Sequence, residues 1–170
     1  ILSPKAVARL EAHPPVIGLP KIFQMMKNGK FNAEIFRGAT INTPSMLCVE
    51  DALDSLNWMA EAGGLPRMIE RSKNSFNVIK DWVGKSDTFA FLAEDERTIS
   101  NTSVCLKMKS PWYRSLDKDR QSQFARDLSG LLEKEDVAYD IGSYRDAPPG
   151  LRIWCGATVE ADDVRTLLPW

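Results

Sequence analysis

Two consecutive helical patterns between residues 44 and 84 restrict the fold of this chain more than any other feature of its sequence. From Val49 to Ala60 apolar residues recur at helical spacing, and Gly63-Gly64 then interrupts the pattern. Pro66 is expected to start a second helix, which ends near Gly84. The inward-facing residues of this helix are expected to be Met68, Ile69, Ser72, Phe76, Ile79 and Val83. Because the two patterns together form the longest helical element in the chain, we predict a helical connector between two lobes.

The residues after 84 have the patterns of a small mixed domain. Four runs of strand-forming residues are expected to be strands, at 88–92, 102–108, 137–141 and 151–155. A helix capped by Asp117 is expected between the second and third runs, with a buried stripe of Phe124, Leu128, Leu131 and Leu132. A last helix is expected to begin near Glu160. This order of elements predicts an α+β fold with a largely antiparallel sheet and helices on one face.

Regular patterns are scarce before residue 45. A short amphipathic helix is expected over residues 4–12 with Ser3 as its cap, whereas prolines and glycines interrupt the region from 14 to 43. A long irregular stretch in a compact domain is usually functional or wraps a partner. The chain opens on Ile1-Leu2-Ser3-Pro4 and closes on an apolar run that ends at Trp170. We interpret it as an internal piece of a longer protein.

Composition excludes several classes of protein. The 170 residues are 44% hydrophobic, which is enough for a core and excludes a disordered chain. No apolar run approaches the roughly 18–20 residues that a membrane-spanning helix needs. The 22 basic and 23 acidic residues are nearly balanced, without the positive excess of nucleic-acid-binding proteins. We therefore expect neither a membrane nor a nucleic acid as a partner.

The cysteines and the single histidine give further expectations. Cys48, Cys105 and Cys155 are odd in number and widely spaced, which favours a reduced, cytoplasmic location over a disulfide framework. His13 stands before two prolines with no second histidine in the chain. We therefore expect no metal site and no Cys–His nucleophile pair.

The segment Asn42-Thr43-Pro44 is the first candidate binding site. Thr43 is a natural N-terminal cap and Pro44 a natural first residue for the helix that follows. A helix start carries unpaired N–H groups and the positive end of the helix dipole, and Asn42 and Thr43 add an amide and a hydroxyl. These donors predict a site for an anion the size of a phosphate. The alternative interpretation is that Thr43 only caps its helix.

Two arginines on either side of a Pro-Pro-Gly turn form the second candidate. Arg152 has apolar neighbours in sequence, and a guanidinium in such surroundings needs a carboxylate or phosphate partner. That partner is either an internal acid, Asp140 or Asp146, or the anion of a ligand, and the same two alternatives apply to Arg145. The residue patterns indicate no nucleophile, general base or other catalytic residue.

Four segments resemble the phosphoserine aminotransferase family. They are residues 19–23, 40–46, 100–107 and 138–156. The last is the most specific, because it contains Tyr144-Arg145-Asp146-Ala147-Pro148-Pro149-Gly150-Leu151-Arg152. The likeness extends in order over essentially the whole chain, is strongest to the bacterial and archaeal branch, and concerns only the C-terminal part of such enzymes.

This resemblance implies a fold-type I enzyme that uses pyridoxal phosphate and is a homodimer with active sites at the subunit interface. Its reaction moves an amino group between glutamate and 3-phosphohydroxypyruvate, giving phosphoserine and 2-oxoglutarate in serine biosynthesis. By resemblance, Asn42 and Thr43 reach the cofactor phosphate of the other subunit, and Arg152 holds the substrate α-carboxylate. Arg145 would hold the phosphate or distal carboxylate, with Tyr144 beside it where relatives have a histidine.

The resemblance also predicts how the chain is divided. Residues 1–45 would be a remnant of the large α/β cofactor-binding domain, residues 46–84 the helical connector, and residues 85–170 the small domain. The Schiff-base lysine of the family would precede Ile1, and Lys5 does not match it. We therefore expect the chain by itself to be inactive and to form no Schiff base.

Two other interpretations stay open at this point. One is a stand-alone module for ligand binding or dimerisation, and the other is a fold-type I transaminase with different substrates. We also expect the chain to associate with itself or with another protein. The apolar faces of residues 14–43 and 44–84 would otherwise be exposed to water.

Overall fold

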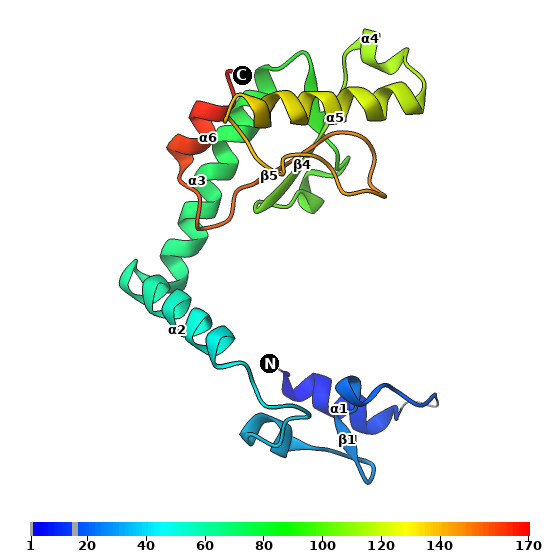
Figure 1. Ribbon diagram of the computed structural model, residues 1–170, viewed down its shortest axis with the longest axis vertical. Helices are drawn as coiled ribbons and strands as arrows, with labels where there is room; N and C mark the ends of the chain where they lie inside the picture. The colour runs from blue at the N-terminus through cyan, green and yellow to red at the C-terminus, as the bar shows by residue number, and fades with distance from the viewer. Residues whose placement is uncertain (1, 15–16) are drawn as a thin grey trace. The chain divides into compact units, whose positions relative to one another are not determined.

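The computed structural model describes residues 2–14 and 17–170 (Figure 1). They form two compact units, Ile1–Leu56 and Asn57–Trp170. The helix α2, Met46–Glu61, begins in the first unit and ends in the second. The sequence analysis expected three segments, 1–45, 46–84 and 85–170, and that division stays a prediction.

The first unit consists of short elements. Helix α1, Pro4–Ala12, is capped by Ser3, whose hydroxyl accepts a hydrogen bond from the Ala6 N–H at 3.2 Å, as the sequence predicts. A β-hairpin with two-residue strands follows, and two short 3₁₀ helices flank it. These elements are η1 (Lys21–Phe23), β1 (Met26–Lys27), β2 (Lys30–Phe31) and η2 (Ala33–Arg37). The sequence Asn28-Gly29 forms the hairpin turn because both residues adopt a positive φ, 53° and 74°.

The start of α2 corrects the prediction that Thr43 is its cap. The helix begins at Met46, and the Ser45 hydroxyl accepts a hydrogen bond from the Cys48 N–H at 3.5 Å. Serine caps helices at least as well as threonine, and Ser45 lies at the position where its oxygen reaches this donor. The apolar side chains of α2 are largely exposed, including Val49, Leu53 and Leu56.

The second unit is built on helix α3, Gly64–Lys85. It begins at Gly64 rather than at the predicted Pro66, because Gly63 takes a left-handed conformation with φ of 109° and turns the chain there. Its buried residues are Met68, Ser72, Ser75, Ile79 and Val83, whereas Ile69 is exposed, contrary to the prediction. The buried hydroxyl of Ser75 donates a hydrogen bond to the carbonyl of Val159.

A three-stranded antiparallel sheet packs against this helix. Its strands are β3 (Phe89–Phe91), β4 (Ser103–Met108) and β5 (Leu151–Trp154), in the order β3-β4-β5. The antiparallel sheet is the predicted one, but the fourth strand predicted at 137–141 is wrong. Asp136 and Asp140 have positive φ values of 56° and 50°, which interrupt an extended strand. Only a single bridge, between Gly142 and Leu151, is formed where that strand would have joined β5.

The remaining helices confirm most of the sequence pattern. Helix α5, Lys118–Lys134, is capped by Asp117, whose carboxylate accepts a hydrogen bond from the Arg120 N–H at 2.9 Å. Its Leu132 is buried, whereas Leu131 is exposed, contrary to the prediction. Helix α6 covers Ala161–Leu167. Two short helices, η3 (Glu96–Thr98) and α4 (Pro111–Arg114), were not predicted.

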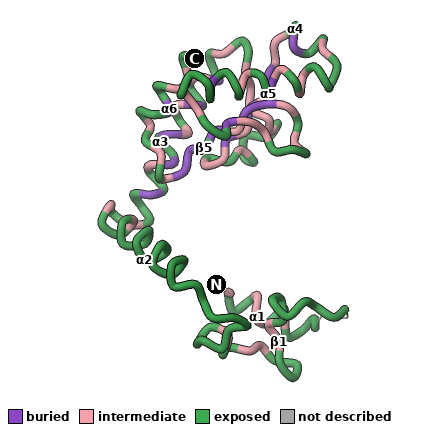
Figure 2. Tube along the Cα trace, in the orientation of Figure 1, coloured by how far each residue is buried: buried purple, intermediate pink, exposed green. Residues whose placement is uncertain are grey.

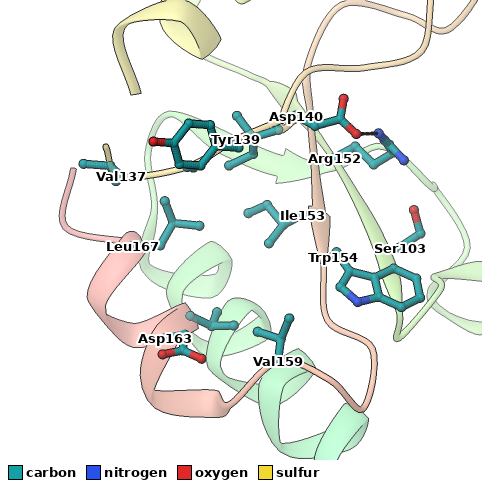
Figure 3. Close-up of a pocket in the computed structure, with 13 residues that line it drawn as sticks. Ser103, Val137, Tyr139, Asp140, Arg152, Ile153, Trp154, Val159, Asp163 and Leu167 are labelled. Carbon is teal, nitrogen blue, oxygen red and sulfur yellow. Dashed lines mark hydrogen bonds and ion pairs between the residues drawn. The ribbon is translucent and has the colours of Figure 1, made fainter. Parts of the chain in front are cut away.

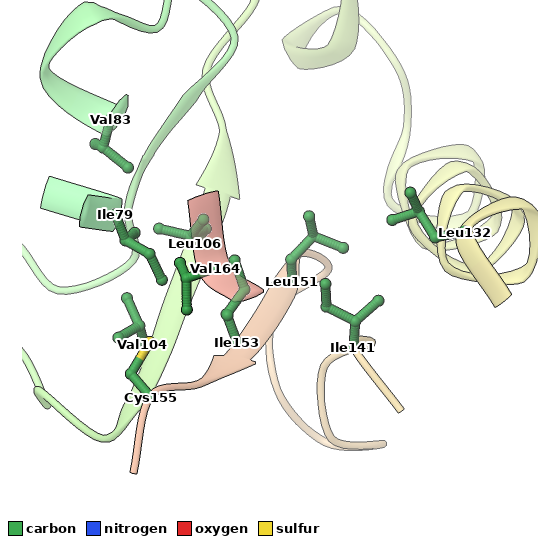
Figure 4. Packing of buried hydrophobic residues seen from close by; sticks show 10 residues of the cluster. All are labelled: Ile79, Val83, Val104, Leu106, Leu132, Ile141, Leu151, Ile153, Cys155 and Val164. Atoms are coloured by element: carbon green, nitrogen blue, oxygen red, sulfur yellow. The ribbon is translucent and has the colours of Figure 1, made fainter. Parts of the chain in front are cut away.

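One face of the sheet carries the core of the second unit. Helices α3, α5 and α6 supply side chains to this face (Figure 4). The buried cluster consists of Ile79, Val83, Val104, Leu106, Leu132, Ile141, Leu151, Ile153, Cys155 and Val164. Figure 2 shows the same division along the chain, since all the residues classed as buried belong to the second unit. The helices therefore cover one face of the sheet, as predicted. The core cluster does not include the side chains on the other face of β4 and β5.

Candidate functional site

The face of β4 and β5 away from the core carries the candidate site. Side chains alternate between the two faces of a strand, so Val104, Leu106 and Ile153 point to the core while their neighbours point away. These neighbours, here called the outer face, are Ser103, Cys105, Lys107, Arg152 and Trp154. The register places Arg152 opposite Cys105, and Trp154 opposite Ser103. The strand pattern thus positions one arginine in the middle of a mostly uncharged surface.

The guanidinium of Arg152 contacts two side chains of the preceding loop. Its Nη2 lies 3.0 Å from Oδ2 of Asp140, and its Nη1 donates a hydrogen bond to the hydroxyl of Tyr144 at 3.1 Å. Its Cζ lies 4.2 Å from the centroid of the Tyr144 ring, within range of a cation–π contact. The Arg152 side chain is 20% exposed, whereas that of Asp140 is 91% exposed. The internal acid that the sequence left open for Arg152 is therefore Asp140.

One donor of Arg152 has no partner. Its Nε is buried and makes no hydrogen bond within the described part of the chain. A buried donor without a partner costs free energy, on the order of 1–3 kcal/mol. Within the described residues, the loss of water from Arg152 Nε is therefore not offset by a hydrogen bond, whereas both terminal nitrogens have partners.

A hollow of about 470 Å³ lies beside Arg152 (Figure 3). Its lining includes the charged side chains of Arg152, Asp140 and Asp163 and the largely apolar ones of Ile153, Trp154 and Leu167. Tyr139 also lines the hollow, and its hydroxyl donates a hydrogen bond to the carboxylate of Asp136 at 2.6 Å. This hydrogen bond raises the pKa of Tyr139 above its ordinary value.

The loop that carries Tyr144 is held close to the sheet at Gly150. A Cβ atom at this position would overlap the carbonyl oxygen of Leu106 on β4. Only glycine permits so close an approach of two backbones. Gly150 thus fixes the end of the loop that brings Tyr144 to Arg152.

Arg145 lies in a different hollow from Arg152. It is exposed and lines a depression of about 430 Å³ between α5 and the loop 142–150, together with Arg126, Ser122 and Ser143. Within the described residues Arg145 forms no ion pair. Tyr144 also lines this second hollow while its hydroxyl contacts Arg152. The structure therefore brings Tyr144 to both arginines but does not bring the arginines into one hollow.

Asn42 and Thr43 lie in the first unit, on the exposed segment before α2. The hydroxyl of Thr40 donates a hydrogen bond to the backbone carbonyl of Asn42 at 2.7 Å. The side chains of Asn42 and Thr43 make no hydrogen bond with another described residue. Because α2 starts at Met46, the argument from a helix N-terminus no longer applies to them, and their capacity to bind an anion rests on their side-chain donors.

The sequence analysis missed Cys105 and Trp154 as neighbours of the site. Period-two alternation along residues 103–108 and 151–154 was the signal that could have placed them on the face of Arg152. The indole of Trp154 lies against Gly156, where a Cβ would overlap the ring, and its Nε1 donates a hydrogen bond to the Thr158 hydroxyl at 3.3 Å. Among the described residues no cluster of His, Cys, Asp and Glu could hold a metal ion.

Comparison with solved structures defines the class of protein. A phosphoserine aminotransferase chain, solved in a study of radiation damage of its Schiff base, matches with a TM-score of 0.64 and 16% sequence identity. The match covers 86% of this chain and 38% of that one. It establishes the fold: the described residues share the architecture of the matched part of that chain. No family model matches the chain.

Comparison with curated proteins identifies relatives of the chain by sequence identity. The phosphoserine aminotransferases of Methanosarcina mazei and Methanosarcina barkeri are 49% and 50% identical to the chain over all 170 residues. The chain spans 43% of the length of each of these relatives. It is a homologue of the C-terminal part of phosphoserine aminotransferases, which confirms the resemblance drawn from the motifs.

Proposed function

We propose that the chain is the C-terminal part of a phosphoserine aminotransferase, which transfers an amino group between glutamate and 3-phosphohydroxypyruvate. The observation that carries this proposal is the Arg152 guanidinium, which is largely shielded and whose terminal nitrogens contact only an exposed carboxylate and a tyrosine hydroxyl among the described residues. Both substrates have an α-carboxylate next to the carbon that exchanges its amino group. An arginine on a rigid strand is suited to hold that carboxylate in a fixed orientation.

Arg145 and Tyr144 support a contact with the end of the substrate far from the α-carboxylate. Arg145 is exposed, and no acidic residue in the described part of the chain pairs with it. In the proposal Arg145 binds the phosphate of one substrate or the distal carboxylate of the other. Tyr144 contacts Arg152 and lines the hollow of Arg145, so it is placed between the two charged ends of such a substrate.

The proposed cofactor is pyridoxal phosphate. Asn42 and Thr43 present an amide and a hydroxyl that are exposed and not engaged by other described side chains, and donors of this kind fit a phosphate group. In the proposal they donate hydrogen bonds to the cofactor phosphate of a second subunit in a homodimer. When bound, the cofactor supplies the electron sink for the reaction at the amino-bearing carbon.

We also propose a cytoplasmic location. All three cysteines lie in the described part of the chain as free thiols, which supports a reducing compartment. Separately, none of the described helices is both long enough and apolar enough to cross a membrane.

The proposal is tested in the complete polypeptide that contains this chain. Purified enzyme is assayed for glutamate formed from phosphoserine and 2-oxoglutarate, and Arg152→Lys is compared with Arg97→Lys, whose arginine pairs with Asp95 on the surface. We expect Arg152→Lys to raise KM at least about tenfold for both phosphoserine and 2-oxoglutarate, because lysine cannot make the bidentate contact. Arg97→Lys should leave KM unchanged. Absence of phosphoserine-dependent activity, or an unchanged KM for Arg152→Lys, would contradict the assignment.

A further inference from the structure

Arg152 is occupied by groups of its own chain. Asp140 and Tyr144 together engage both terminal nitrogens of the guanidinium, at 3.0 Å and 3.1 Å. Those are the nitrogens with which an arginine grips a carboxylate end-on. Both terminal nitrogens of Arg152 are therefore already in contact with a partner when a carboxylate ligand approaches from solution. One of these partners, Asp140, is itself a carboxylate.

The contact with Asp140 is of a kind that can be exchanged. The Asp140 carboxylate is 91% exposed and sits in a loop position with φ of 50°, outside any strand or helix. An ion pair with so exposed a partner contributes little to stability. Releasing Asp140 returns its carboxylate to water, where it is well solvated. Opening the pair without a replacement leaves the shielded charge of Arg152 unpaired, so the open state is the minor one until another anion takes the place of Asp140.

We propose that Asp140 is an internal competitor for the substrate carboxylate. Its side chain holds Arg152 until the carboxylate of a ligand displaces it, and it thereby lowers the affinity of the site for every substrate that binds through Arg152. This inference rests on the proposed role of Arg152 as the carboxylate-binding residue. When a site is only partly available, the apparent dissociation constant rises by the inverse of the available fraction. For an ion pair of this exposure the expected factor is about two to five.

The opposite role of Asp140 predicts the opposite result. A carboxylate that positioned Arg152 for its ligand would help binding, so its removal would weaken affinity. A competitor hinders binding, so its removal must strengthen affinity. Asp140→Asn separates the two, because asparagine tolerates the left-handed conformation at this position and removes only the charge.

The experiment uses the complete, ¹⁵N-labelled polypeptide that contains this chain and measures by NMR its binding of glutarate, a dicarboxylate with no amino group to transfer. The backbone amides of residues 103–105 and 152–154 are the reporters. Wild type is compared with Asp140→Asn, with Arg152→Lys, and with Asp146→Asn as a matched control in the same loop. We expect Asp140→Asn to bind glutarate about two to five times more tightly, Asp146→Asn to equal wild type, and Arg152→Lys to bind at least about tenfold more weakly.

The outcomes separate this inference from the proposed function. Equal or weaker binding by Asp140→Asn, together with binding that Arg152→Lys weakens, overturns the competitor role and leaves the carboxylate role of Arg152 intact. Binding that is as tight in Arg152→Lys as in wild type, or no binding by any variant, overturns both. Dispersed amide signals that remain unchanged elsewhere in the Asp140→Asn spectrum show that its fold is preserved.

Discussion

Arg152 shows how a single side chain obtains a special environment from its position in a strand. Its neighbours Leu151 and Ile153 are buried on the core face, so Arg152 must point to the other face. There its stem is shielded by the sheet and its charged end reaches the loop 140–144. A position one residue earlier or later would bury the charge in the core, at a large cost in free energy.

Gly150 gives a prediction at this scale. We expect Gly150→Ala to lower the free energy of unfolding by about 2 kcal/mol or more, because its methyl group would overlap the Leu106 carbonyl, which is backbone and cannot turn aside. Urea denaturation measures the change. The matched control is Gly130→Ala within α5, which meets no atom within 4 Å and should be neutral or stabilising by roughly 0.5–1 kcal/mol. Equal stability of the two variants would refute the close approach.

Part of the candidate site could be predicted from the sequence, residue by residue. It singled out both arginines and named Asp140 among the possible partners of Arg152. It could not show that Arg145 lines another hollow, because that depends on the path of the loop 142–150 and on where α5 lies against it. The cofactor-binding role of Asn42 and Thr43 stays a prediction, as does the substrate-binding role of Tyr144 and both arginines.

Helices were predictable in this chain because their ends and apolar spacing are encoded locally. Ser3 and Asp117 cap the helices that the sequence assigns to them. The 137–141 strand was wrong although its residues favour a strand. The left-handed conformations of Asp136 and Asp140 decide against it, and a tendency of aspartate toward that conformation was the only local sign.

The cap of α5 supplies a prediction at the scale of the element. Asp117→Ala removes the acceptor for the Arg120 N–H and should cost about 1 kcal/mol in the free energy of unfolding. Asp127→Ala, in the middle of the same helix, should cost nothing or stabilise slightly, because alanine favours helix. Thermal unfolding followed by circular dichroism compares the two. Similar losses for both variants would mean that Asp117 contributes charge alone.

The whole molecule contains two units that differ in how they are stabilised. Both clusters of buried hydrophobic residues lie within residues 57–170. The described residues of the first unit are at most half-buried, although its short elements are well formed. Sequence composition predicted enough apolar residues for a core but could not show that the core would gather in one unit.

Exposed apolar residues of α2 predict association at this scale. Val49, Leu53 and Leu56 are spaced to lie along one side of the helix and are all exposed. Such a stripe seldom remains in water, so light scattering should give a mass above that of one chain at high concentration. Leu53→Glu should reduce that mass, whereas Ser55→Glu adds the same charge off the stripe and should not. A one-chain mass for the wild type at every concentration would contradict the prediction.

The alternation along β4 and β5 also has an evolutionary consequence. Core positions such as Val104 and Ile153 tolerate few substitutions, because any change of volume there is felt by three helices. Outer positions such as Cys105 and Trp154 can vary without that penalty. Ligand preference can therefore drift by replacement of every second residue in these strands, while the intervening residues keep the domain folded.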